Sequence, residues 1–279
     1  MNEARINAKD IRESAIAGTW YPGDPVRLAK EVGDYLEKVP DRELPGTLLG
    51  LVAPHAGYVY SGQVAAYSYK LLKGKSYPIV IILSPSHRPY YGGVLVTKKR
   101  YYRTPLGLVE VAVDLVERVH EQMTLDFIGQ DQEHSLEIQL PFLQMTLSEF
   151  KLVPLMMENQ SIETCQGLAQ VLAGVFSQGN ALFVASSDLS HFYDYDRATK
   201  LDRRALEDIE RYDAVGFARD VATGKCEACG AGPIATVLLA TKALGGDKVT
   251  ILKYANSGDV TGDRWRVVGY GAAAVTRSA

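Results

Sequence analysis

The sequence predicts a three-layer α/β/α domain with a mainly parallel or mixed central sheet. Two observations carry this prediction: short apolar runs alternate with segments of helical periodicity, and the alternation continues along nearly the whole chain. An apolar content of 47% over 279 residues is ordinary for a globular protein with a sizeable core. No internal repeat, low-complexity tract or linker divides the sequence, so we expect a single domain over residues 1–279.

The expected strands are short apolar runs that end at turn-forming residues. The first run ends at Pro54, the second at Ser84-Pro85, and a later one at a pair of serines. Apolar runs without polar alternation are typical of strands that are buried on both faces. In chain order, the expected strands are 48–53, 78–83, 151–156, 181–185, 249–254 and 266–270.

The expected helices occupy the segments between the strands, where apolar residues recur every three to four positions. Ser61, which can cap a helix, opens one of them, and Pro233 opens the last. In chain order, the expected helices are 26–39, 61–72, 113–123, 136–146, 162–176, 197–211 and 233–244.

Composition excludes several classes of protein. A net charge of −3 argues against a nucleic-acid-binding protein, and no apolar stretch approaches the ~18 residues of a membrane helix. The N-terminus is polar and lacks the apolar region of a secretory signal, and three cysteines cannot all pair. We therefore expect a cytoplasmic protein that binds neither nucleic acid nor membrane. Neither of the common glycine-rich nucleotide-binding motifs occurs.

Two histidines follow prolines at the ends of two expected buried strands. His55 follows Pro54, and His87 follows Ser84-Pro85-Ser86. A lone histidine beside a strand is often only a structural hydrogen-bonding group. Here, adjacent parallel strands would place both imidazoles at the same edge of the sheet, where open α/β sheets bind ligands. The two histidines are therefore candidate ligands of one metal ion.

Two further loops contain ionisable groups that are candidates for acid–base chemistry. Asp188 and His191 follow another apolar strand, three residues apart. This spacing suits a carboxylate that orients an imidazole, or two groups that face one cavity, but Asp188 can also cap the next helix. His134 lies among acidic neighbours that would raise its pKa, although a surface helix start explains it equally well.

Cysteines and aromatic residues complete the set of candidates. Cys226 and Cys229 have the spacing of half a zinc site or a redox pair, but no second such pair exists. Cys229 precedes a glycine-rich turn and a helix, and a helix N-terminus lowers the pKa of a thiol. Trp20 and Tyr21 either cap the core or line a pocket.

Several separate motifs resemble those of the Memo family and occur in the same order. The resemblance extends from about residue 16 to residue 274. The Memo family is similar in fold to the type III extradiol ring-cleavage dioxygenases, which are non-haem Fe(II) enzymes with an α/β/α core, so the resemblance implies a single domain. The motifs are Ala17-Gly18-Thr19-Trp20-Tyr21-Pro22, Pro54-His55-Ala56-Gly57-Tyr58-Val59-Tyr60-Ser61-Gly62, Pro85-Ser86-His87, Glu133-His134-Ser135-Leu136-Glu137, Ser186-Ser187-Asp188-Leu189-Ser190-His191 and Ala228-Cys229-Gly230.

The resemblance implies roles for individual residues. His55 and His87 match the two family histidines that bind the metal, and Cys229 matches the cysteine that completes the site. The remaining matches line the same pocket: His134, Asp188 and His191 as candidate catalytic groups, and Trp20 and Tyr21 as its aromatic edge. Cys226 has no counterpart.

The resemblance leaves three functions open. The first is a metal-dependent oxidoreductase with Fe(II), which acts with O₂ on a small hydroxylated aromatic substrate. Because Cys229 stands where the dioxygenases have a glutamate, the site would also accept Cu or Zn, and the fold alone does not guarantee ring cleavage. The second is a zinc hydrolase. The third is a non-catalytic module that binds a peptide or small ligand in the same pocket, as animal members bind phosphorylated peptides. Oligomeric state stays open.

Overall fold

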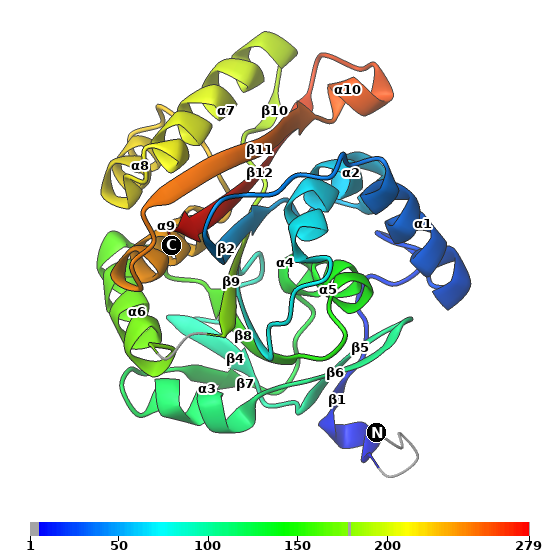
Figure 1. Cartoon of the computed structure of the whole chain (residues 1–279), viewed down its shortest axis with the longest axis vertical. Helices are drawn as coiled ribbons and strands as arrows, with labels where there is room; N and C mark the ends of the chain where they lie inside the picture. Colours follow the sequence, from blue (N-terminus) through cyan, green and yellow to red (C-terminus); the bar gives the residue numbers. More distant parts are fainter. Residues whose placement is uncertain (1–5, 178–179, 279) are drawn as a thin grey trace.

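The computed structural model describes residues 6–177 and 180–278 and has the expected three-layer α/β/α architecture. A nine-stranded mixed sheet forms the middle layer. Helices from residues 25–69 and 134–146 cover one face, and helices from residues 162–243 cover the other (Figure 1). No helix among the described residues is both long and apolar enough to cross a membrane.

The sheet is built around four parallel strands in the order β2, β9, β3, β8. On one side the sheet continues with β12, which is antiparallel to β2, and with β10 and β11, which both pair antiparallel with β12. On the other side β4 pairs antiparallel with β8, and β7 pairs in parallel with β4. The strands of this sheet are β2 (Thr47–Ala53), β3 (Ile79–Pro85), β4 (Val94–Thr97), β7 (Asp126–Ile128), β8 (Lys151–Met157), β9 (Ala181–Ser186), β10 (His191–Tyr193), β11 (Lys248–Asn256) and β12 (Val267–Arg277).

The four parallel strands are buried nearly throughout, as their apolar sequences predict. However, the expectation that β2 and β3 are adjacent is wrong. β9 lies between them and pairs in parallel with both, so that three strand ends, not two, meet at this edge of the sheet. The third end carries the Asp188 loop.

Each predicted helical segment contains a helix, but two of these helices differ in detail from the prediction, and the helices Ala214–Ala222 and Gly258–Thr261 were not predicted. The predicted helix 136–146 is divided into α4 and α5, because Pro141 has no N–H to continue the first helix. Helix α2 begins after Gly57, so Ser61 lies inside it and does not cap it. The helices are α1 (Pro25–Glu37), α2 (Tyr58–Tyr69), α3 (Val113–His120), α4 (His134–Glu137), α5 (Leu140–Thr146), α6 (Ile162–Val175), α7 (Tyr195–Glu210), α8 (Ala214–Ala222), α9 (Ala231–Ala243) and α10 (Gly258–Thr261), with 3₁₀ turns η2 (Ala8–Asp10) and η3 (Lys70–Leu72).

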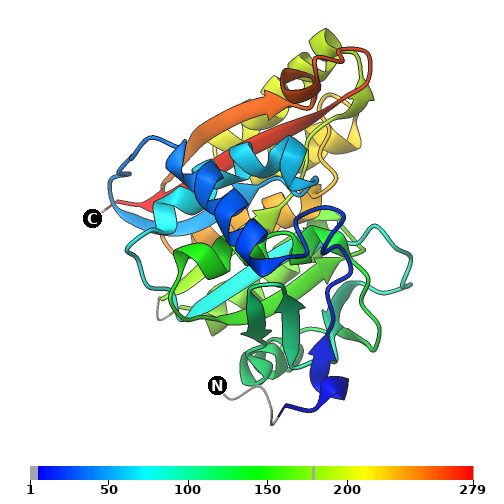
Figure 2. The ribbon, with the colours of Figure 1, turned by 90° about the vertical axis from the view of Figure 1, so that its right-hand side faces the viewer.

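A second, three-stranded sheet lies apart from the main one. It contains β1 (Ile11–Arg12), β5 (Tyr101–Thr104) and β6 (Gly107–Glu110), and Figure 2 shows the N-terminal strand β1 beside this sheet. The strand β1 is only two residues long, but its pairing with β5 fixes the path of the N-terminal segment. This path places Arg12 beside the loop that precedes α4.

Candidate metal centre

Loops from three parallel strands and one helix N-terminus converge at the carboxyl edge of the sheet. His55 follows β2, His87 follows β3, Asp188 follows β9, and Cys229 precedes α9. The imidazole centroids of His55 and His87 lie 5.3 Å apart. The carboxyl edge of a parallel sheet is where α/β proteins bind ligands, and here it gathers ligand-competent side chains.

His55, His87 and Cys229 form a cluster with the donor atoms of a metal site. One ring nitrogen of each histidine and the Cys229 sulfur all lie within 4.8 Å of one another. Cys229 Sγ and His55 Nε2 lie 3.1 Å apart. Two imidazoles and a thiolate are ligands for Zn, Cu or Fe. The donor set therefore fits the metal that the sequence predicts at this place.

Hydrogen bonds on the other side of His55 determine which of its nitrogens can bind a metal. Ser186 Oγ donates its proton to the carbonyl oxygen of Ser135 and accepts a hydrogen bond from Gln139 Nε2. The contact of 3.0 Å with His55 Nδ1 must then have the imidazole as donor. Because the proton is on Nδ1, the lone pair is on Nε2, the atom that faces Cys229.

One carboxylate oxygen holds two of the histidines in the same way. Glu133 Oε1 lies 3.0 Å from Nδ1 of His87 and 3.0 Å from Nδ1 of His134, and Oε2 accepts the backbone N–H of His87 at 2.6 Å. A carboxylate only accepts, so both imidazoles carry their proton on Nδ1 and present a lone pair at Nε2. The proximity of these three residues is therefore explained by hydrogen bonding, with Nε2 of each ring left free.

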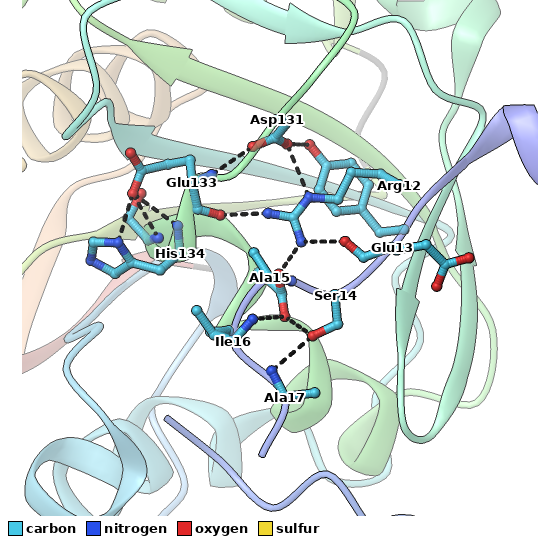
Figure 3. Close-up of polar contacts among 12 residues, drawn as sticks. Arg12, Glu13, Ser14, Ala15, Ile16, Ala17, Asp131, Glu133 and His134 are labelled. Carbon is cyan, nitrogen blue, oxygen red and sulfur yellow. Dashed lines mark hydrogen bonds and ion pairs between the residues drawn. The ribbon is translucent and has the colours of Figure 1, made fainter. Parts of the chain in front are cut away.

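A buried ion-pair network holds the backbone of Glu133 in place. Arg12 Nη2 donates to the carbonyl oxygen of Glu133, and Arg12 Nε lies 3.4 Å from Asp131. Figure 3 shows the guanidinium among these groups, with His134 beyond Glu133. Burial alone would raise the pKa of Glu133, but hydrogen bonds from His134 and His87 hold that pKa well below its usual range. Glu133 is thus an ionised, fixed acceptor.

Arg12 also pairs with Glu137, which fastens the N-terminal segment to α4. Glu137 is fully buried, and an isolated buried carboxylate would be very costly. Five donors surround it instead, and they come from consecutive parts of the N-terminal segment. They are the side chains of Arg12, Ser14 and Tyr21 and the backbone N–H groups of Ala15 and Ile16.

The N-terminal segment places Trp20 and Tyr21 differently. Trp20 is 36% exposed and contacts His134, with ring centroids 4.2 Å apart. Tyr21 is only 3% exposed, and its hydroxyl donates to Glu137, so most of its ring packs in the core. Both residues border a cavity of about 910 Å³, which His55, His87, His134, Asp188 and His191 also line.

Asp188 and His191 both face this cavity, but Asp188 does not orient the imidazole of His191. Asp188 Oδ1 accepts the backbone N–H of His55 at 2.7 Å, and burial raises the Asp188 pKa. The acidic partner of His191 is Glu227, whose Oε1 lies 3.5 Å from Nδ1. The interpretation that Asp188 caps the next helix is also wrong, because the N-cap of that helix is Asp194. Of the three interpretations of this pair, the remaining one agrees with the structure: Asp188 and His191 are two groups that face one cavity.

The prediction that the helix N-terminus lowers the pKa of Cys229 is wrong for the metal-free protein. Burial and the nearby Asp188 raise that pKa, and they outweigh the backbone N–H groups at the start of α9. A bound cation would reverse this balance, because metals bind the thiolate. Cys226 and Cys165 are buried elsewhere, and all three cysteines are free, so Cys226 and Cys229 form no disulfide.

Sequence reasoning missed several residues that hold the site. Glu133 and Glu137 stand inside a recognised motif, but nothing in the spacing shows that they accept bonds from His87 or from the N-terminal segment. Ser186 carries no signal beyond its position at a strand end. Arg12 is isolated in a polar N-terminus, and only β1 pairing brings it to the acidic loop.

Comparisons with known proteins agree with the motifs. Residues 12–274 match the family described as Memo-like protein. A MEMO1 family protein of Methanopyrus kandleri is 37% identical over 278 residues, covering 94% of this chain and 97% of that protein. One from Methanosarcina mazei is 38% identical over 268 residues, covering 94% and 98%.

A solved structure shares the fold. The crystal structure of the uncharacterized protein JW3007 from Escherichia coli K12 superposes with a TM-score of 0.53, at 14% sequence identity, over 81% of this chain and 99% of that one. At this identity the likeness concerns the fold alone. The family match covers nearly the whole chain and includes every residue of the cluster described above. The chain belongs to the Memo family.

Proposed function

We propose that the protein is a metal-dependent oxidoreductase, with non-haem iron or copper at His55, His87 and Cys229. Its substrate would be a small hydroxylated aromatic compound, which donates electrons to O₂. The observation that carries the proposal is the cluster of three donor atoms within 4.8 Å of one another, two of whose residues, His55 and His87, line a cavity of about 910 Å³. A cavity of this size is ample for a single substituted ring.

The hydrogen bonds around the cluster support the assignment of the ligands. Nε2 is the free nitrogen in both His55 and His87, because Ser186 and Glu133 bind the Nδ1 protons. A histidine ligand commonly donates its other N–H to a carboxylate or a neutral oxygen, which fixes the ring. A bound iron or copper ion would supply a site where O₂ and a substrate hydroxyl can be activated.

His134 is the residue best placed to take a proton from the substrate. Its Nδ1 proton is held by Glu133, so Nε2 can accept a proton, and the Glu133 carboxylate would stabilise the resulting imidazolium. The contact with Trp20 fixes the plane of the ring. Of the other two cavity groups, His191 is a second acid–base candidate, whereas Asp188 holds the His55 backbone in place.

Anaerobic purification, metal analysis and an oxygen electrode test the proposal. The protein loaded with Fe(II) or Cu(I) should consume O₂ when catechols are added, and the metal-free protein should not. Replacement of His55 by Ala should abolish both metal retention and oxygen uptake.

Two outcomes would contradict the proposal and identify an alternative. A protein that holds zinc and hydrolyses esters or amides, without oxygen uptake under any metal, would be a hydrolase. A protein that binds catechols or peptides tightly but shows no turnover with iron, copper or zinc would be a binding module.

A further inference from the structure

Phe192 is a bulky aromatic residue with an unfavourable backbone conformation at the cavity wall. Its φ is +65°, in the left-handed region that favours glycine, and a residue of this kind is strained there. Its side chain is 60% exposed, whereas phenylalanine is usually buried. Strained residues that persist at a cavity point to a role in that cavity.

A β-bulge explains how Phe192 reaches the cavity. His191 pairs with Val268 and Tyr193 pairs with Val267, so β10 advances by two residues where β12 advances by one. In a regular strand, neighbouring side chains point to opposite faces. Here both His191 and Phe192 line the cavity, because the bulge re-aims the extra residue.

Arg266 lies against the Phe192 ring. Its guanidinium carbon is 5.2 Å from the ring centroid, and the residue borders the same cavity. Within residues 6–177 and 180–278, no carboxylate forms an ion pair with Arg266. The neighbouring Arg264 differs, because it pairs with Asp196 at 3.9 Å, lies over Tyr195 and does not border the cavity.

Three carboxylates line the cavity besides the subsite, and among the described residues none of them forms an ion pair with Arg266. Asp188 accepts the backbone N–H of His55, and Asp263 accepts the backbone N–H of Trp265. The third is Glu31. The cavity also gathers several of the exposed large apolar side chains of the protein, namely Trp20, Val59, Tyr60 and Phe192. Such a wall favours a planar ring.

We infer that Phe192 and Arg266 form a specificity subsite for an aromatic carboxylic acid, with the ring packed on Phe192 and the carboxylate paired with Arg266. That the ligand carries hydroxyl groups rests on the proposed function. That it carries an acid group rests on the subsite alone. A planar guanidinium binds a carboxylate through two parallel hydrogen bonds, which provides both affinity and orientation. The single guanidinium beside Phe192 matches the single charge of a carboxylate.

Calorimetric titration without turnover tests the charge preference. The probes are 3,4-dihydroxyphenylacetate and its neutral amide, added anaerobically in the presence of Zn²⁺. The acid should bind the wild-type protein about tenfold more tightly than the amide, which corresponds to one charge-assisted hydrogen-bonded pair. Arg266→Gln should bring the ratio close to one without weakening the amide, and the matched control Arg264→Gln should retain the preference.

Phe192→Gly tests the ring contact separately from folding. Glycine adopts a φ of +65° without strain, so this variant should melt at the same or a higher temperature. It should nevertheless bind both probes several-fold more weakly, because the stacking surface is lost. Weaker binding accompanied by a lower melting temperature would indicate a merely structural role for Phe192 and would contradict the inference.

Other outcomes would also overturn the subsite. Equal binding of acid and amide by the wild-type protein excludes a carboxylate site, and a loss of preference in Arg27→Gln instead of Arg266→Gln places the anion elsewhere. Tighter binding of phenyl phosphate than of phenylacetate would exclude a carboxylate as the preferred anion. Oxygen uptake with neutral catechols tests the proposed function independently, so either idea can fail while the other stands.

Discussion

Cys229 Sγ lies 3.1 Å from His55 Nε2, although 174 residues separate the two in the sequence. The contact exists because α9 begins directly beside the ends of β2 and β9. The main-chain carbonyl of Asp188 accepts the N–H of Cys229, and the Asp188 carboxylate accepts the N–H of His55. Asp188 therefore fixes the backbone of two of the three prospective ligands, independently of any metal.

Glu133→Gln should weaken metal binding by about 10- to 100-fold, the usual effect of losing a hydrogen-bond partner of a metal ligand. A neutral glutamine oxygen is a weaker acceptor than the carboxylate Oε1 that serves both His87 and His134. The NH2 group of the glutamine would also face the backbone N–H of His87, which Oε2 now accepts. Competition with a chromophoric chelator measures the affinity.

Glu227→Gln is the matched control for that variant, because Glu227 contacts only His191 among the cavity histidines. Its metal affinity should stay within about twofold of wild type. Equal affinity in the two variants would mean that Glu133 does not orient a metal ligand.

His191→Ala should retain nearly full metal content but reduce turnover by roughly 10²–10⁴, the range for a general acid–base group. The reason is that His191 borders the cavity, but its Nδ1 faces Glu227, and among the described residues it belongs to no cluster of possible metal ligands. Metal content by atomic emission and oxygen uptake are measured on the same sample. Loss of the metal itself would make His191 a ligand and refute this assignment.

Arg12→Met should destabilise the protein by about 3–5 kcal/mol, because it leaves Glu137 and Asp131 as buried charges without their cation. Urea unfolding at neutral pH gives the free energy. Arg100 is exposed, so the control variant Arg100→Met should change the free energy of unfolding by no more than ~0.5 kcal/mol.

A double variant, Arg12→Met with Glu137→Leu, separates a charge effect from general damage. The combined cost should be well below the sum of the two single costs, because neither Arg12 nor Glu137 is then left buried without the other, and only Asp131 still loses its cation. Additive costs would show that the two residues act independently.

Peroxide should modify Cys229 before Cys226 or Cys165 in the metal-loaded protein. Cys229 is partly exposed and is a thiolate when it binds a metal, whereas the other two thiols are buried. Burial also raises the pKa of Cys226 to about 12. Mass spectrometry of the modified peptides gives the order, and preferential oxidation of Cys226, or a Cys226–Cys229 disulfide, would revive the redox-pair interpretation.

The sequence predicted the layers of the fold and the place of the cluster, because both depend on local patterns. Buried parallel strands appear as uninterrupted apolar runs, and β2, β3 and β9 were all visible in this way. Short, partly exposed strands such as β5 and β10 have no such pattern and were missed. The order of β2, β9 and β3 depends on long-range pairing, which no local pattern contains.

The supporting residues of the site were beyond sequence reasoning for the same physical reason. Arg12 and Glu137 are 125 residues apart, and a buried ion pair appears in a sequence only as two ordinary charges. Phe192 is a strained residue only because β10 carries a bulge against β12. The pKa of Cys229 was also predicted in the wrong direction. Burial raises it more than the helix N-terminus lowers it, and burial depends on the whole fold.

A cobalt titration under anaerobic conditions tests the metal centre most directly. Co²⁺ bound by a thiolate has an intense charge-transfer absorption in the near ultraviolet, which imidazole and carboxylate ligands do not produce. One equivalent should generate this band in the wild-type protein and in Cys226→Ser, and the band should be absent from Cys229→Ser and from His55→Ala. A band that persists in Cys229→Ser, or that disappears in Cys226→Ser, would contradict a centre built from His55, His87 and Cys229.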